Sequence, residues 1–360
     1  MSEEKPIKGG EFIIRDTAPK DIFTPEEWTE EHKMIASMCE DFILQEIIPH
    51  LDRIDSLEEG LMPSLLKKAG ELGLLGLSVP EEYGGMGVDF KTTLLATEYL
   101  GLGFSFSVAY GAHTGIGTLP LLYYGNDEQK NKYVAKLASG EWAAAYCLTE
   151  PGSGSDANSG KTKADLSEDG SYYTLNGQKM WITNGGFANL FTVFAKIEDD
   201  KNLTAFLVEA DSEGITLNPE EKKMGIKGSS TRQVFFNNVK VPIENMLSER
   251  GNGFKIALNI LNIGRIKLGA AVMGGAKGGI DESVRYALER EQFGRSISKY
   301  GAIRYKLAEQ AIQTYAVESA TYRAGQNIDD AIKGLMESGM DKAQATLQGI
   351  ELFAPECAVI

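Results

Sequence analysis

Apolar residues in the first 140 positions recur at helical spacing, between short breaks that are rich in glycine and proline. From Thr24 to Asp55 they fall three or four positions apart, which predicts one amphipathic helix. The opening Thr24-Pro25-Glu26-Glu27 combines an N-cap hydroxyl, a first-turn proline and acidic side chains near the positive end of the helix dipole. Further helices are expected over 63–74, 90–102, 109–124 and 127–137. We therefore predict a polar lead over 1–23 and an all-helical N-terminal domain over 24–140.

The pattern changes near Glu141, where β-branched and aromatic residues begin to dominate. Two β-favouring runs, 172–175 and 179–182, flank the dipeptide Asn176-Gly177, which is the strongest short signal for a hairpin turn. Further strands are expected over 191–195, 204–208 and 233–239. We predict a β-barrel-like middle domain over 141–245.

Helical spacing returns from Gly253 onward and predicts a C-terminal helix bundle over 246–360. The stretch 269–279 is dense in glycine and alanine, and each glycine inside a helix costs about 1 kcal/mol relative to alanine. Close helix packing and a nearby ligand both explain that composition. The chain ends on the apolar residues Ala358, Val359 and Ile360, which is typical of a fragment, because a native domain rarely leaves such an end uncovered. The fold class is therefore α+β multidomain, with an incomplete bundle.

Composition then narrows the functional classes. The 360 residues carry 51 acidic and 36 basic side chains, a formal charge of −15, which excludes a dedicated nucleic-acid binder. With 42% hydrophobic and 24% charged residues, the chain is not disordered. Three scattered cysteines and three histidines without ligand spacing indicate a reducing compartment and no metal site. The acidic N-terminus and the lack of an 18-residue apolar run indicate a cytoplasmic protein without a membrane span.

The most distinctive segment is Tyr146-Cys147-Leu148-Thr149-Glu150-Pro151-Gly152-Ser153-Gly154-Ser155-Asp156. Its glycines allow close backbone approach, and its amides and the hydroxyls of Thr149 and Ser155 are donors for anionic oxygens. The segment also matches a dinucleotide fingerprint, but that motif requires a following helix, whereas a β-hairpin is expected here. A plain surface turn is the alternative interpretation.

A second segment, Met180-Trp181-Ile182-Thr183-Asn184-Gly185-Gly186, stands at a predicted strand end. A flat Trp181 ring at the rim of a β domain would form a platform for a planar conjugated cofactor. The alternative is an ordinary core aromatic.

Two further segments carry cationic side chains that could meet an anionic ligand. Lys222, Lys223 and Lys227 form a basic stretch in an acidic protein, suited to phosphates or simply a solvated loop. Arg265 follows Leu261-Asn262-Ile263-Gly264 on a predicted helix, where it either forms a salt bridge or holds a ligand.

Together with Lys-Met-Gly-Ile-Lys-Gly-Ser and with Arg-Glu-Gln-Phe-Gly at 290–294, these segments occur in an order that resembles the acyl-CoA dehydrogenase family, most of all its very-long-chain branch. The resemblance covers roughly 24–360. It implies FAD as cofactor and fatty acyl-CoA as substrate, with electron transfer flavoprotein as partner in a homo-oligomer, a dimer or tetramer. The residues that it implies for cofactor binding are Tyr146, Leu148, Thr149, Gly154, Ser155, Trp181, Ile182, Thr183, Arg290 and Gln292. Those that it implies for substrate binding are Ser155, Asn262 and Arg265.

The same resemblance implies oxidation of a saturated acyl thioester, with loss of an α-proton to a carboxylate base and of a β-hydride to the flavin. The family's base is a glutamate in a Glu-Gly-Thr-type motif, which does not occur up to Ile360. Some members place the base just before the arginine matched by Arg265, where this chain has Gly264. No catalytic residue is therefore assigned, and the chain is expected to be inactive by itself.

The resemblance leaves the substrate and the acceptor of electrons open. Gly101 and Gly103 end a predicted helix that would line the acyl end of the substrate pocket. On this basis we expect medium to long acyl chains. The alternatives are an acyl-CoA oxidase-like or flavin monooxygenase-like enzyme of the same fold, or a non-catalytic protein that binds flavin or acyl-CoA.

Overall fold

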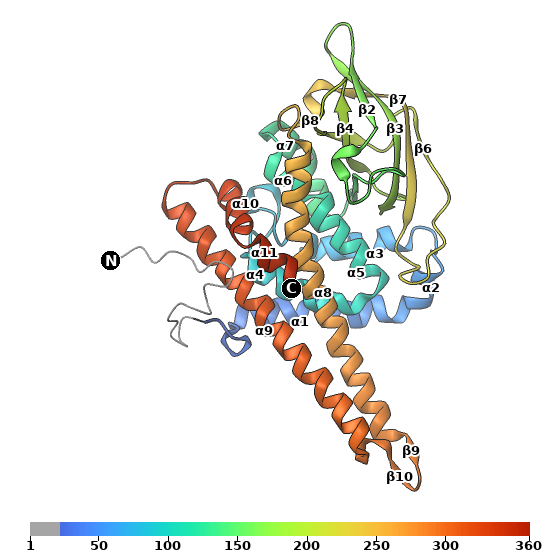
Figure 1. Ribbon diagram of the computed structural model, residues 1–360, viewed down its shortest axis with the longest axis vertical. Coiled ribbons are helices and arrows are strands. Elements are labelled where there is room, and N and C mark those ends of the chain that lie inside the picture. Colours follow the sequence, from blue (N-terminus) through green and yellow to red (C-terminus); the bar gives the residue numbers. More distant parts are fainter. Residues whose placement is uncertain (1–21) are drawn as a thin grey trace. The chain divides into compact units, whose positions relative to one another are not determined.

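The computed structural model describes residues 22–360 (Figure 1). These residues divide into two compact units. The helical unit contains 22–43, 89–104 and 265–360, and the sheet unit contains 44–88 and 105–264. Almost all of the predicted polar lead lies outside the described residues. The predicted domain boundaries at 140 and 245 stay a prediction, since each unit combines separate stretches of chain.

The helical unit contains long helices and a small hairpin. Its elements are α1 (Glu30–Phe42), α4 (Phe90–Leu100), the later part of α8 (Gly253–Glu289), β9 (Glu291–Gln292), β10 (Arg295–Ser296), α9 (Gly301–Glu337), α10 (Lys342–Leu352) and α11 (Ala354–Val359). The hairpin β9–β10 connects α8 to α9 (Figure 1). By length and composition alone α8 could cross a membrane, but core helices share these properties, and Ile256, Ile260 and Ile266 on it are fully buried.

Glycines allow α4 and α8 to approach closely within the helical unit. A Cβ added at Gly101 would lie 3.0 Å from Cα of Ala271, and one at Gly274 would lie 2.9 Å from the carbonyl carbon of Glu98. Both distances are shorter than ordinary van der Waals contact. Close packing of α4 against α8 therefore explains why residue 274 is glycine. Gly101, at the end of α4, allows the same close approach of the two helices.

The prediction of a single helix from Thr24 to Asp55 is wrong. A 3₁₀ turn (Pro25–Glu27) comes first, and α1 begins only at Glu30, capped by the Thr29 side chain. After Phe42 the chain passes through a π-helical turn (Ile43–Ile47) and a 3₁₀ turn (Ile48–His50) before α2 (Leu51–Asp55). The interruption falls at Pro49, which has no N–H for the helical hydrogen bond and whose ring clashes with the preceding turn.

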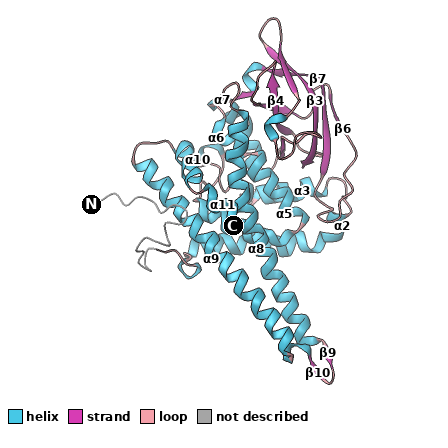
Figure 2. Cartoon of the chain, viewed as in Figure 1, coloured by secondary structure: helices cyan, strands magenta, loops and turns pink. Residues whose placement is uncertain are grey.

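The sheet unit combines a large sheet with short helices (Figure 2). Its helices are α2, α3 (Leu61–Glu71), α5 (Ser105–Gly111), α6 (Leu119–Tyr124), α7 (Asp127–Ala138) and the start of α8. Its strands are β1 (Ala144–Cys147), β2 (Lys163–Leu166), β3 (Tyr172–Thr183), β4 (Leu190–Ile197), β5 (Thr204–Glu209), β6 (Ile215–Leu217), β7 (Thr231–Pro242) and β8 (Met246–Leu247). The sheet order is β6-β7-β3-β2-β4-β5-β8, and β1 pairs with β4 in parallel. Alternate residues such as Phe191 and Val193 of β4 and Phe206 of β5 form its core.

The predicted hairpin turn at Asn176-Gly177 is also wrong. β3 runs straight through both residues, and the chain reverses between β2 and β3 at 167–171, where Gly170 has a φ of 70°. Asn176 and Gly177 instead mark a register shift against β7. A Cβ at Gly177 would overlap the Thr162 side chain, so glycine here reflects a bulge with close backbone approach. The fold class itself, helical, sheet and helical segments in one α+β chain, is confirmed.

Candidate functional site

Two hydrogen bonds join the turn that follows β1 to the C-terminal part of β3. The Thr149 carbonyl accepts from the Met180 N–H at 2.9 Å, and the Leu148 carbonyl accepts from Nζ of Lys179 at 3.1 Å. Residues 148–149 and 179–180 therefore lie side by side, although about 30 positions separate them in the sequence. The structure thus brings the 146–156 segment next to the part of β3 that leads into Trp181.

Trp181 lies at an irregularity of the β3–β7 ladder. Lys179 pairs with Val234 and Ile182 with Arg232, so two residues of β3 oppose one of β7. Trp181 has a φ of 60° and is 54% exposed. The left-handed backbone conformation costs a non-glycine residue about 1–3 kcal/mol, and residues in this conformation are concentrated at functional sites. The ring is therefore displayed at the surface, and the core-aromatic interpretation does not hold.

A buried ion pair lies directly beneath the turn. Nζ of Lys179 is 2.7 Å from Oε1 of Glu150, and both side chains are almost fully buried. Burial opposes ionisation of the carboxyl, but the ammonium and the backbone N–H of Lys161 outweigh it and lower the pKa of Glu150. The sequence analysis missed this pair, although Glu150 stands inside the motif and a lysine among the apolar residues of a strand is unusual.

The glycine-rich part of the turn is open on its outer side. Ser153 is buried and its Oγ donates to the carbonyls of Asp156 and Ala157 at 3.0 and 3.1 Å. Gly154 and Ser155 are exposed, and a Cβ added at Gly154 would meet nothing within 4 Å. An anionic ligand can therefore reach this backbone without moving a side chain.

Three predicted cofactor residues are wholly or partly enclosed. Ile182 is 2% exposed and Thr183 is half-buried. Tyr146 is also buried, and its ring packs edge-on to Phe194 at 4.8 Å. The Tyr146 hydroxyl has no hydrogen-bond partner within the part of the chain that the structure describes.

The remaining predicted residues lie on α8 and the hairpin after it. Asn262 is half-buried and Arg265 is exposed one helical turn later. Arg265 also lines a mostly apolar cavity of about 520 Å³ within the helical unit, between α8, α9 and α11. Arg290 and Gln292 are exposed at the end of α8 and in β9, next to Phe293, which is 94% exposed.

The basic segment has two kinds of lysine. Nζ of Lys223 donates to the Ser229 carbonyl and, at 2.9 Å, to Oγ1 of Thr231, and burial lowers the pKa of this lysine. Lys222 and Lys227 are exposed. Lys223 therefore supports the loop, while Lys222 and Lys227 remain available to an anion.

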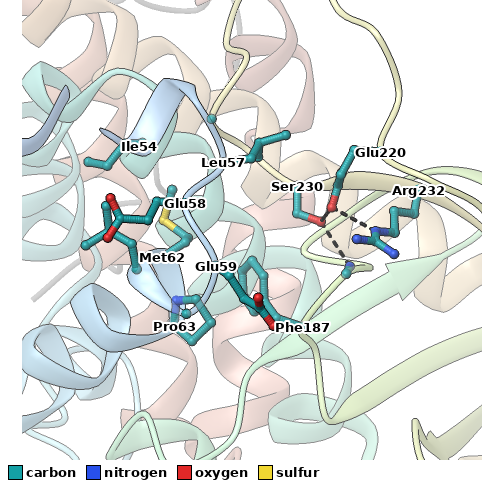
Figure 3. Close-up of a pocket in the computed structure, with 14 residues that line it drawn as sticks. Ile54, Leu57, Glu58, Glu59, Met62, Pro63, Phe187, Glu220, Ser230 and Arg232 are labelled. Carbon is teal, nitrogen blue, oxygen red and sulfur yellow. Dashed lines mark hydrogen bonds and ion pairs between the residues drawn. The ribbon is translucent and has the colours of Figure 1, made fainter. Parts of the chain in front are cut away.

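A second cavity, of about 380 Å³, lies within the sheet unit between α2, α3 and the ends of β3 and β7 (Figure 3). Glu220 accepts from Nε of Arg232 at 2.8 Å and from Oγ of Ser230 at 2.7 Å at one side of it. The rest of the lining includes the carboxylates of Glu58 and Glu59 together with Ile54, Leu57 and other apolar side chains. None of the predicted cofactor or substrate residues lines this cavity.

Comparison with known proteins assigns the chain to a family. Models of the acyl-CoA dehydrogenase N-terminal, middle and C-terminal domains match residues 29–141, 145–239 and 251–354. This chain belongs to the acyl-CoA dehydrogenase family, as the sequence motifs predicted.

Individual relatives agree with this assignment. A probable acyl-CoA dehydrogenase of Bacillus subtilis is 47% identical over 352 residues, which are 98% of this chain and 59% of that protein. The human mitochondrial very long-chain specific acyl-CoA dehydrogenase is 46% identical over 77% of this chain and 43% of its own length. A crystal structure of an acyl-CoA dehydrogenase complexed with FAD from Bacillus anthracis superposes with a TM-score of 0.94, at 48% identity, over 98% of this chain and 60% of that one. The chain thus spans 59% or less of the length of these two relatives. The predicted truncation of the chain stays a prediction.

Proposed function

We propose that this chain carries the flavin platform and part of the substrate site of an FAD-dependent enzyme that dehydrogenates fatty acyl-CoA thioesters at the α,β bond. The observation that carries the proposal is the hydrogen bond from the Met180 N–H to the Thr149 carbonyl. It fixes the turn at Leu148 and Thr149 to the residue before the exposed Trp181, an arrangement that supports a site for a planar cofactor. The family assignment and the FAD in the Bacillus anthracis structure support the same function.

The residues present fit FAD. Trp181 offers an exposed ring for stacking, and the open backbone at Gly154 and Ser155 suits a pyrophosphate. Leu148, Thr149 and Thr183 would bind the edge of the flavin, with Tyr146 and Ile182 completing the enclosed side. Arg290 and Gln292 would reach the FAD of a neighbouring subunit in a homo-oligomer. When bound, FAD supplies a hydride acceptor.

The substrate in this proposal is a medium to long fatty acyl-CoA. Ser155, Asn262 and Arg265 would bind it, and the exposed Lys222 and Lys227 would meet the anionic CoA moiety. No catalytic base is proposed within the 360 residues, because the position before Arg265 is Gly264 and no Glu-Gly-Thr motif occurs. The chain by itself is therefore expected to bind FAD without turning over substrate. We further propose that it acts in the cytoplasm, and that electron transfer flavoprotein is the partner of the complete enzyme.

Titration with FAD tests the platform. We expect a yellow protein with flavin absorbance, which Trp181→Ala combined with Thr149→Ala abolishes because stacking and a hydroxyl donor are both lost. Tyr172→Ala, at the other end of β3, is the matched control and should keep the flavin. A folded protein that binds no FAD would contradict the proposal.

Turnover of an acyl-CoA ladder by the full-length protein tests the reaction. The largest kcat/KM is expected for medium to long chains, and a preference for short branched acyl groups would contradict that choice. Peroxide formed without an added electron acceptor would favour the oxidase-like alternative.

A further inference from the structure

Glu150 and Lys179, two charged residues that the sequence analysis did not assign to the site, contact each other and the turn at Leu148. Lys179 lies on β3 with its side chain fully buried, and its Nζ contacts both the Glu150 carboxylate at 2.7 Å and the Leu148 carbonyl at 3.1 Å. A trans peptide holds its carbonyl and its N–H in opposite directions. Because the Leu148 carbonyl faces the ammonium, the Thr149 N–H faces away from it.

The next peptide group follows the same rule. The Thr149 carbonyl faces the Met180 N–H at 2.9 Å, so the Glu150 N–H must point the other way. It donates to the Ser153 carbonyl at 3.1 Å. Two consecutive peptide planes of the turn are thus set by bonds to β3, and one of those bonds comes from a buried ammonium.

The Glu150 carboxylate completes the frame. It accepts from the backbone N–H groups of Lys161 at 2.6 Å and Thr162 at 3.0 Å, in addition to the Lys179 ammonium. A carboxylate with three donors is fixed in position, and it anchors the turn to the start of β2. Lys179 in turn is anchored through that carboxylate, so the two side chains act as one unit.

Stability alone is a weak reason for burying such a pair. Desolvation offsets much of the attraction between buried opposite charges, and apolar replacements of similar volume are often as stable. The contacts that an apolar pair could not reproduce are the bonds to the Leu148 carbonyl and to the N–H groups of Lys161 and Thr162.

We propose that Glu150 and Lys179 are positioning residues for the flavin, which orient the Thr149 amide and the turn around it toward the cofactor. The proposal rests on the proposed function, because it assumes that FAD occupies this platform. Neither residue touches the reacting atoms. Each acts through the backbone of Leu148 and Thr149.

The test compares Lys179→Met, Glu150→Gln and the double variant. Each single variant leaves one buried charge without its opposite charge, so both stability and FAD affinity should fall. The double variant removes both charges and should recover most of the thermal stability. Its FAD dissociation constant should nevertheless stay raised by roughly tenfold, as expected when one or two hydrogen bonds to a ligand are misdirected.

Two further readouts separate positioning from a purely structural role. At saturating FAD, the double variant should show a shifted visible flavin spectrum and a lower flavin reduction potential, because a misdirected amide stabilises the reduced, electron-rich ring less. Lys132→Met with Glu209→Gln is a control for the loss of an ion pair elsewhere in the same unit, since this more exposed pair joins α7 to β5 at 2.9 Å. The control should leave FAD affinity, spectrum and potential unchanged.

The outcomes distinguish this proposal from the proposed function. If the unsubstituted protein binds no FAD, the proposed function fails and this inference fails with it. If the unsubstituted protein binds FAD, and the double variant matches it within twofold in affinity and has the same spectrum and potential, only the positioning role is overturned.

Discussion

Alanine at Gly274 should destabilise the helical unit, whereas alanine at the next residue should stabilise it. Inside a helix, alanine in place of glycine gains about 1 kcal/mol. At Gly274 that gain is opposed, because the new Cβ would lie 2.9 Å from the carbonyl carbon of Glu98 and still nearer its oxygen. Overpacking against a backbone that cannot move aside costs about 3 kcal/mol, which leaves a net loss of about 2 kcal/mol for Gly274→Ala.

Gly275 provides the matched control on the same helix. It is exposed, and a Cβ added there would meet nothing within 4 Å. Gly275→Ala should therefore raise the free energy of unfolding by about 1 kcal/mol, a difference of about 3 kcal/mol between neighbouring variants. Urea titration followed by far-ultraviolet circular dichroism measures both. Equal stabilities, or a more stable Gly274→Ala variant, would refute the argument that α4 and α8 require glycine where they meet.

Two further changes test buried polar groups. His113 is fully buried, accepts from the Ala144 N–H at 3.0 Å and has its pKa lowered by burial to about 4. The unfolded chain therefore binds the proton more tightly, and stability should fall by about 3 kcal/mol as the pH drops from 7 to 4. Urea midpoints across this pH range should depend less on pH in His113→Gln than in the unsubstituted protein. Parallel pH curves for the two proteins would contradict the lowered pKa of His113. Lys277 bridges Glu98 at 2.5 Å and Glu318 at 2.6 Å. Lys277→Met should cost about 2 kcal/mol, allowing for its partial exposure. Adding Glu98→Gln should restore much of this in thermal unfolding, and no recovery would contradict the pairing.

The two wrong predictions of local structure have different causes. Asn176-Gly177 carries the same residues whether it forms a tight turn or a bulge, and the pairing of β3 with β7 decides between them. The break near Pro49 is instead local: apolar residues keep helical spacing on both sides, but the proline itself interrupts the helix. Local pattern reports which face of an element is apolar. It does not report which neighbouring strand or backbone that face will meet.

The candidate site also has features that the sequence alone predicts and features that depend on the folded structure. The sequence was sufficient to find the motif around Thr149, the aromatic residue Trp181 and the family that they indicate. These features depend on residues that are adjacent in the chain. The partnership of Glu150 with Lys179 was not accessible from the sequence, because 29 positions separate them and only the folded sheet brings their charges to 2.7 Å. The sequence by itself determined the order of helical and sheet segments and the chemical type of the site. Tertiary structure decided which peptide groups that site presents, because hydrogen bonds between distant segments set their direction.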